Sequence, residues 1–256
     1  MRRFILALAC LLLFPLAAAG CDDDDDGNDA VPSPPVGATA TAPATTATPS
    51  TAPAITIDEP LEGGDVTAPI QMSGTANVFE AVLHIDALGN AAGTVLCSRR
   101  VMATSGTGTP GDWSGVLAFA PPETAAPITL RAYSFSPRDG AMEHLVERSV
   151  TLQPQRPNIV ITSPKCAEEV SGAMMTVEGM AQVFEAALVV DLRDEFGTVI
   201  DQQFVMAASG VEFSPWNATF DVSALAPGFY DVVAWSESPQ DGRVINVFPV
   251  QITLAP

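Results

Sequence analysis

Val78-Phe79-Glu80-Ala81 recurs further along the chain as Val183-Phe184-Glu185-Ala186. The stretch belongs to an internal repeat, because other motifs recur in the same order in both halves. The matched pairs are Val101-Met102-Ala103 with Val205-Met206-Ala207, Trp113 with Trp216, and Ser136-Pro137-Arg138-Asp139-Gly140 with Ser238-Pro239-Gln240-Asp241-Gly242. We therefore expect two homologous domains, at 55–153 and 158–254. The proline-bounded segment 153–157 should limit the angle between them.

Each copy shows the period-two pattern of β-strands. In the last segment, Phe248, Val250 and Ile252 alternate with residues that would lie on the opposite face. β-branched and aromatic residues are frequent, and no segment keeps a helical period. The expected strands are 55–58, 70–75, 82–87, 94–103, 113–119 and 128–135, then 187–192, 198–207, 217–222, 229–236 and 244–254. About seven strands in about 100 residues predict an all-β fold of two tandem immunoglobulin-like β-sandwich domains.

The first residues have the pattern of a bacterial secretory signal. Two arginines precede an apolar run at 4–19, which is shorter than the roughly 20 residues of a membrane-spanning helix. The run ends in Ala18-Ala19-Gly20-Cys21 and resembles the lipobox of bacterial lipoproteins. This implies cleavage between Gly20 and Cys21 and a lipid on Cys21. The alternatives are an ordinary signal in which Cys21 is an incidental thiol, and a retained anchor helix.

Residues 21–54 lack the composition of a folded domain. Five aspartates at 22–26 precede a tract that consists mainly of Ala, Pro, Thr, Val and Ser. Such a tract cannot bury a core, and its charge and prolines favour extended chain. We therefore expect a disordered tether between the lipid and the first domain.

The chain is strongly acidic, with 11 Lys and Arg against 30 Asp and Glu and a formal net charge of −19. Nucleic acid is excluded as a partner, since phosphate binding requires clustered basic residues and Lys165 is the only lysine. The same charge repels an anionic leaflet, so we expect membrane attachment through the lipid alone. The expected location is extracytoplasmic, at the cell surface or the periplasmic face.

Two of the repeated motifs indicate structural roles. Ser-Pro-x-Asp-Gly suits a hairpin turn, because Pro presets φ, Asp bonds the backbone ahead and Gly accepts a positive φ. A tryptophan at the start of a strand favours a core anchor over an exposed ligand platform. The residues concerned are Pro137, Asp139, Gly140, Pro239, Asp241, Gly242, Trp113 and Trp216.

Glu80 and Glu185 each follow a phenylalanine, Phe79 or Phe184, among apolar residues. A carboxylate there is costly unless it accepts backbone N–H bonds or pairs with an arginine. We expect a structural clamp on a neighbouring loop, and the alternative is a cation or ligand contact. A weak calcium signal, without the spacing of an EF-hand loop, comes from Asp191, Asp194 and Glu195.

Two further cysteines, Cys97 and Cys166, remain beyond Cys10 and Cys21. An exported protein meets an oxidising compartment, where disulfides persist. Connectivity does not follow from sequence, so two options stay open. The pair forms a disulfide, or both side chains are buried as small apolar residues.

Catalytic motifs are absent from the sequence. His84 and His144 both lie in the first copy, and no nucleophile elbow, zinc-protease, phosphate-loop or dinucleotide pattern occurs. The carboxylates do not form a recognisable acid and base pair. We therefore expect a protein that is not an enzyme, with no catalytic residue, metal or cofactor.

Together the motifs resemble the immunoglobulin-like domain of bacterial spore germination. In the first copy Ser73-Gly74-Thr75-Ala76-Asn77 precedes Val78-Phe79-Glu80-Ala81, and a strand ending in Val-x-Ala, a Trp and Ser-Pro-x-Asp-Gly follow. The second copy departs to Glu178-Gly179-Met180-Ala181, and its Ser163-Pro164 is matched by Glu59-Pro60. The resemblance implies a non-catalytic, all-β module of bacterial surface lipoproteins.

These features predict a lipid-anchored cell-envelope lipoprotein. Its two domains bind, or are displayed toward, an envelope protein or glycan or an extracellular ligand. One alternative is a passive spacer or assembly element of the cell surface. Another is a protein associated with spore germination or with an envelope hydrolase, for which Glu80 and His84 would be the residues to test.

Overall fold

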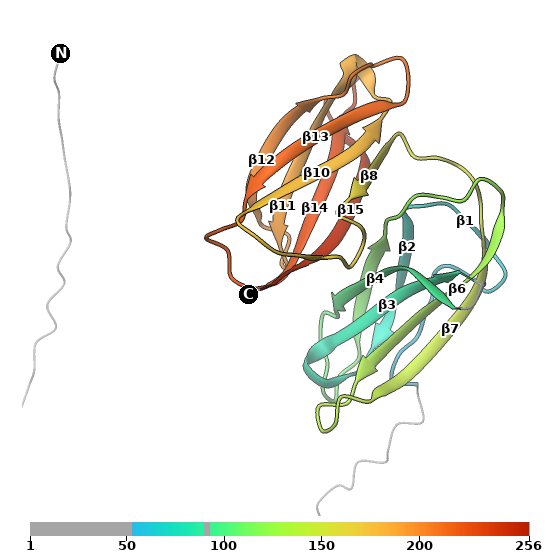
Figure 1. Ribbon diagram of the computed structural model, residues 1–256. Coiled ribbons are helices and arrows are strands. Elements are labelled where there is room, and N and C mark those ends of the chain that lie inside the picture. The colour runs from blue at the N-terminus through green and yellow to red at the C-terminus, as the bar shows by residue number, and fades with distance from the viewer. Residues whose placement is uncertain (1–52, 90–92, 256) are drawn as a thin grey trace, which may run out of the picture. The chain divides into compact units, whose positions relative to one another are not determined.

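The computed structural model describes residues 53–89 and 93–255. Within these residues the chain is all-β, and the helical elements are two three-residue 3₁₀ turns, η1 (Phe79–Ala81) and η2 (Phe184–Ala186). Strands gather into two sandwiches, one for each copy of the repeat (Figure 1). The predicted fold class, all-β with two tandem immunoglobulin-like domains, is therefore confirmed.

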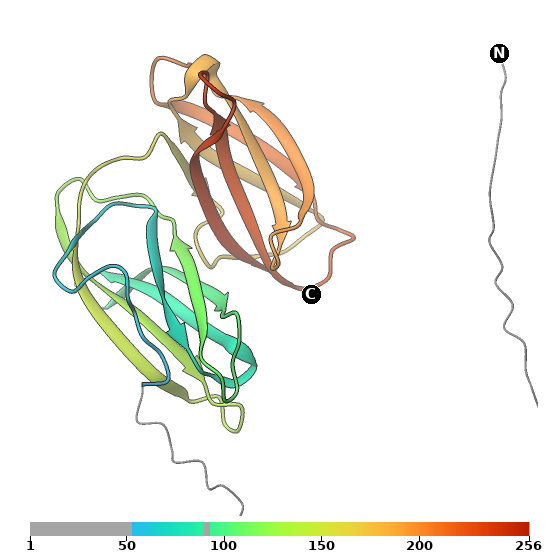
Figure 2. The same ribbon diagram turned by 180° about the vertical axis from the view of Figure 1, so that it is seen from behind.

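The strands of the first domain are β1 (Asp65–Val66), β2 (Ile70–Ala76), β3 (Val82–Gly89), β4 (Thr94–Met102), β5 (Gly111–Leu117), β6 (Ala126–Phe135) and β7 (Met142–Leu152). Five of them form one sheet in the order β1-β7-β6-β3-β4. The other layer pairs β2 with β5, and Figure 2 brings this layer to the front. Bridges from Ile55 to Ala76 and from Glu59 to Ser73 place the leading segment beside β2. The leading segment therefore covers the outer side of β2, whereas β4 ends the large sheet with no strand beyond it among the described residues.

The strands of the second domain are β8 (Ile159–Ser163), β9 (Glu169–Val170), β10 (Met174–Ala181), β11 (Ala187–Asp194), β12 (Val199–Met206), β13 (Ser214–Asp221), β14 (Gly228–Glu237) and β15 (Val244–Leu254). The order β12-β11-β14-β15-β9 repeats the large sheet of the first domain, and β13-β10-β8 repeats the small one. β12 is thus the counterpart of β4.

Alternate strand residues fill the space between the two layers of each domain. In β15, Phe248, Val250, Ile252 and Leu254 are buried, as the period-two pattern predicts, whereas Val244, which the same pattern places on that face, is exposed at the start of the strand. Burying a large apolar side chain stabilises a fold by about 1.5–3 kcal/mol. Each domain has a cluster of such residues, so each has its own core.

A glycine faces a tryptophan in the small sheet of each domain. Gly74 pairs with Trp113, and Gly179 pairs with Trp216. Both indoles are 3% exposed, and Trp113 Nε1–H donates to the Thr56 carbonyl at 3.2 Å. A Cβ on Gly179 would lie 2.3 Å from Cζ2 of Trp216. The indole therefore occupies space that any residue other than glycine would fill.

Ser-Pro-x-Asp-Gly forms the turn between the last two strands of each domain. In the first domain Gly140 N–H donates to the Ser136 carbonyl at 2.9 Å, and Ala141 N–H donates to Asp139 Oδ1 at 3.2 Å. Hydrogen bonds from the Ser136 hydroxyl and the Ala141 N–H hold the pKa of Asp139 below its ordinary value. Gly140 and Gly242 have φ of 71° and 69°, the left-handed region that favours glycine.

Candidate functional site

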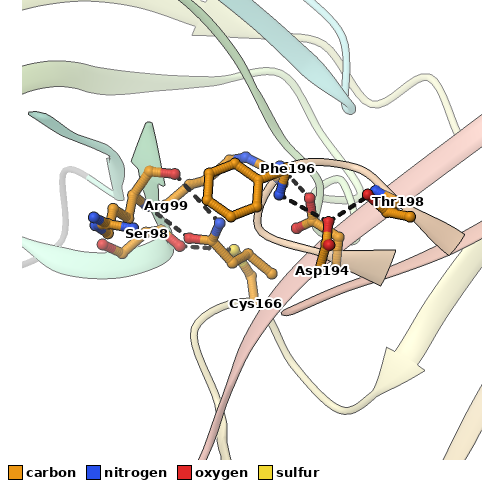
Figure 3. Close-up of polar contacts among 9 residues, drawn as sticks. Ser98, Arg99, Cys166, Asp194, Phe196 and Thr198 are labelled. Atoms are coloured by element: carbon orange, nitrogen blue, oxygen red, sulfur yellow. Dashed lines mark hydrogen bonds and ion pairs between the residues drawn. The ribbon is translucent and has the colours of Figure 1, made fainter. Parts of the chain in front are cut away.

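A disulfide joins the two domains. Cys97 in β4 is bonded to Cys166, which lies between β8 and β9, and their Cα atoms are 5.1 Å apart, within the usual range for a disulfide. Cys166 Sγ also lies 3.3 Å from the Ser98 carbonyl oxygen (Figure 3). Of the two options that the sequence leaves open for these cysteines, the structure contains the disulfide. It crosses from one domain to the other instead of bridging the layers of one sandwich.

Gln251 in β15 completes the edge of β4. Arg100 N–H donates to Gln251 Oε1 at 2.7 Å, and Gln251 Nε2 donates to the Arg100 carbonyl at 3.3 Å. β4 is the last strand of its sheet, so its outward backbone groups have no neighbouring strand. The Gln251 amide occupies part of the place that such a strand would take.

Two ion pairs lie beside this contact. Arg99 Nη2 donates to Asp231 Oδ2 at 2.5 Å. Arg100 pairs with Glu195, and its guanidinium carbon lies 5.3 Å from the ring centre of Phe229. Burial raises the pKa of Asp231, and the charge of Arg99 opposes that rise. Desolvation of Asp231 offsets part of the attraction in the Arg99–Asp231 pair, so we expect this pair to add little to the stability of the contact.

The connecting segment adds a contact of its own, since the Arg156 guanidinium carbon lies 3.8 Å from the ring centre of Phe213. The sequence motifs did not single out Arg99, Arg100, Asp231 or Gln251. Comparison of the two copies could have pointed to Arg100 and to Cys97. Arg100 aligns with Phe204 of the second copy, and Cys97 aligns with Asp201. Such differences in residue type between two aligned strands indicate positions at which only one copy makes a given contact.

The Val-Phe-Glu-Ala motif forms the same turn in both domains. Glu80 and Ala81 have φ of 54° and 60°, and Glu185 and Ala186 have φ of 54° and 57°. Left-handed conformations are uncommon for residues other than glycine. The turn is closed in each case by a 3.1 Å hydrogen bond from the alanine N–H to the valine carbonyl that precedes the phenylalanine.

The glutamate side chains of this motif do not form the expected clamp. Both are exposed, and no hydrogen bond or ion pair reaches either carboxylate in the described part of the chain. Instead the Glu80 N–H donates to Thr107 Oγ1 at 3.2 Å, and the Thr107 N–H donates to the Val78 carbonyl at 3.0 Å. The prediction of a carboxylate clamp is wrong, because the left-handed turn points the side chain to solvent and the backbone holds the loop.

Asp191 and Asp194, two of the calcium candidates, are bonded to donors of the protein. Asp191 Oδ2 accepts from Trp235 Nε1 at 2.9 Å and from Arg193 Nη2 at 2.5 Å. Asp194 Oδ1 accepts the Thr198 N–H at 2.8 Å, and this bond is the main cause that lowers the pKa of Asp194 (Figure 3). Within 53–89 and 93–255, no three His, Cys, Asp or Glu side chains form a group that would hold a metal ion.

His84 is a packing residue in an aromatic cluster. Its ring stacks on Tyr133 at 5.6 Å and meets Phe135 edge-on at 5.0 Å, centre to centre. Burial lowers the pKa of His84. The charge of Asp86 opposes this change, and the charge of Arg100 lowers the pKa of His84 further. The neutral imidazole is therefore favoured in the folded domain.

The predictions for the N-terminus fall outside the described residues. They comprise the signal peptide at 1–20, cleavage at Gly20, the lipid on Cys21 and the tether as far as residue 52. Among the residues that the structure does describe, no helix has the length and apolar character needed to cross a membrane.

The two sandwiches and their shared turns match a known family. A family model for the immunoglobulin-like domain of bacterial spore germination matches residues 54–141 and 158–243. The chain belongs to this family. Its two spore-germination immunoglobulin-like domains are consistent with a non-catalytic structural or binding role. No curated protein matches the chain.

Several solved structures are similar to these spore-germination immunoglobulin-like domains. An engineered protein shares 24% identity over 43% of this chain, with a TM-score of 0.30, and the chain spans 22% of its length. Fibronectin(III)-like modules of Clostridium thermocellum CbhA share 17% identity over 78% of this chain and 93% of theirs, with a TM-score of 0.27. An ICAM-5 D1–D4 ectodomain fragment shares 18% over 78% of this chain and 53% of its own, with a TM-score of 0.26. None of them extends the assignment beyond the family.

Proposed function

We propose that the chain is a lipid-anchored lipoprotein of the cell envelope. Its two immunoglobulin-like domains bind an envelope protein or glycan, or an extracellular ligand, outside the cytoplasm. Cys21 carries the lipid, residues 22–54 form the tether, and the paired domains are the binding part.

The Cys97–Cys166 disulfide is the observation that carries this proposal. Disulfides form and persist in oxidising compartments and are rare in the cytosol, so the bond supports an exported location. It also links the domains covalently, so that a partner meets both as one unit. Such pre-organisation reduces the entropy that binding costs.

Fractionation and lipid labelling test the anchor. Cys21→Ser should release the protein from the membrane fraction and remove the incorporated fatty acid, because no other acylation site resembles a lipobox. Cys10→Ser, within the signal, serves as the matched control and should keep the label. A Cys21→Ser protein that is labelled like the wild type contradicts the anchor.

Crosslinking of intact envelopes tests the binding role. The full-length protein should recover the same partner reproducibly, and replacement of residues 158–254 by an unrelated immunoglobulin-like domain should abolish the recovery. If no partner is recovered from repeated crosslinking, the binding role is wrong.

A passive spacer is the second candidate, and the inter-domain contacts favour it too, since a disulfide joins the domains and two ion pairs lie beside it. For a spacer only reach matters. The same domain replacement should then preserve the phenotype, whereas shortening the chain by one domain should change it.

A further inference from the structure

An apolar groove runs along β12, the edge strand of the large sheet in the second domain. Phe204 and Met206 are 82% and 66% exposed, and Phe184 of the neighbouring turn is 62% exposed. Together with Pro239 they line a groove of about 370 Å³. Large apolar side chains clustered on an edge strand are characteristic of interaction sites.

The backbone of β12 is open along this groove. Ala207 N–H donates to the Ala186 carbonyl of the neighbouring turn, which fixes the alternation of hydrogen bonds along the strand. In an antiparallel pair every second residue directs its N–H and C=O away from the partner strand. Phe204 and Met206, opposite Val189 and Ala187, are such residues. No other group in the described part of the chain bonds to this edge at Phe204 or Met206.

In the first domain, the backbone groups of the equivalent edge strand, β4, are bonded by another part of the chain. Arg100 is the counterpart of Phe204, and its N–H and C=O are both bonded to the Gln251 amide. Its side chain pairs with Glu195. One copy thus uses this edge within the chain, whereas the other presents a phenylalanine and an unpaired backbone.

The groove has a definite charge. Glu185 and Glu237 line it, and none of its lining residues is basic. Both carboxylates lie beside exposed apolar side chains, so a cationic group placed between apolar contacts would complement the site. A neutral apolar ligand would leave both charges unmatched.

We propose that β12 and this groove bind an extended peptide segment of a partner protein in which apolar and basic residues occupy every second position, so that both kinds of side chain lie on the face that meets the groove. The segment adds a strand to the sheet, its backbone pairs with Phe204 and Met206, its apolar side chains contact Phe184 and Phe204, and its basic side chains face the carboxylates. The inference rests on the proposed binding function and names the site and the class of partner.

Titration of the full-length chain with a synthetic peptide tests the proposal. The probe is a peptide of about ten residues, the length of a long strand, with lysine, valine and phenylalanine at every second position and threonine between them. It should bind saturably. A peptide with glutamate in place of lysine, and one with N-methyl groups on alternate amides, should each bind at least about tenfold more weakly. Absence of saturable binding by the lysine peptide overturns the proposal, as does equal binding of either control peptide.

Two variants locate the site. Phe204→Arg, which copies the residue of the first domain, should weaken binding at least about tenfold, because it removes the aromatic contact and adds a like charge. Val211→Ser is the matched control, since Val211 is also exposed, in the same domain, and does not line the groove. Both variants should keep the wild-type melting temperature. Equal binding by Phe204→Arg and the wild type overturns the proposal.

Envelope crosslinking with Phe204→Arg separates this inference from the proposed function. Loss of the recovered partner supports the groove as its site. If the wild type and Phe204→Arg recover the same partner equally, the binding function stands and the inference about the groove is wrong.

Discussion

The side-chain amide of Gln251 bonds both backbone polar groups of Arg100, at 2.7 Å to the N–H and 3.3 Å to the carbonyl. A residue of one domain thereby completes the exposed strand edge of the other. The arrangement shows how a short side chain can substitute for a strand at one position.

Gln251→Leu should destabilise the protein by about 1–3 kcal/mol. Gln251 is buried, so the leucine would cover the Arg100 N–H and C=O without bonding them. Urea unfolding measures the change. Gln240→Leu, in an exposed turn, should have an effect within about 0.5 kcal/mol of zero. Equal unfolding free energies for Gln251→Leu and the wild type contradict the assigned role.

Reduction of the disulfide should lower stability by about 4 kcal/mol in the chain-entropy model, because Cys97 and Cys166 are separated by 69 residues. The Cys97→Ser, Cys166→Ser double variant should unfold at the lower temperature with or without reductant. The wild type should approach that temperature only when reduced. Two free thiols found by labelling the unreduced, denatured protein, in addition to any at Cys21, would be incompatible with the bond.

His84 should give the first domain a pH-dependent stability. Burial lowers the pKa of His84 in the folded state, so below the ordinary pKa of 6.5 the unfolded chain takes up the proton first. Stability should therefore fall as pH decreases through 6.5 toward the lowered folded pKa, and it should be unaffected by this group well above 6.5. His84→Val, which copies Val189 of the second domain, should flatten the dependence. A wild-type profile that is already flat in this range argues against the effect.

Gly179→Ala should destabilise the second domain by about 1–3 kcal/mol, since the new Cβ would lie 2.3 Å from the indole of Trp216. Tryptophan fluorescence should report the displaced ring together with a lower melting temperature. At Gly89 a Cβ would have its nearest neighbouring atom 3.5 Å away, so Gly89→Ala is a suitable control. Unchanged stability of Gly179→Ala would mean that the small sheet adjusts without cost.

Local patterns predicted the fold well, because they depend on neighbours in sequence. The alternation in 244–254 predicted β15, and the repeat identified β12 as the equivalent of β4 in the other domain. Long-range pairing was not predictable in the same way. That Cys97 bonds Cys166, and that Asp231 meets Arg99, depends on how two separately folded domains contact one another. Glu80 was misjudged, because its apolar neighbours do not reveal a left-handed turn that exposes it.

The disulfide also determines how the protein would carry a mechanical load. Tension applied between the N-terminal side of the first domain and a partner held by the second would pass from Cys97 directly to Cys166. β5, β6 and β7 lie in the bypassed stretch and would bear none of it once the segment before Cys97 is taut. The disulfide is therefore a covalent crosslink that limits how far the paired domains can be extended under tension.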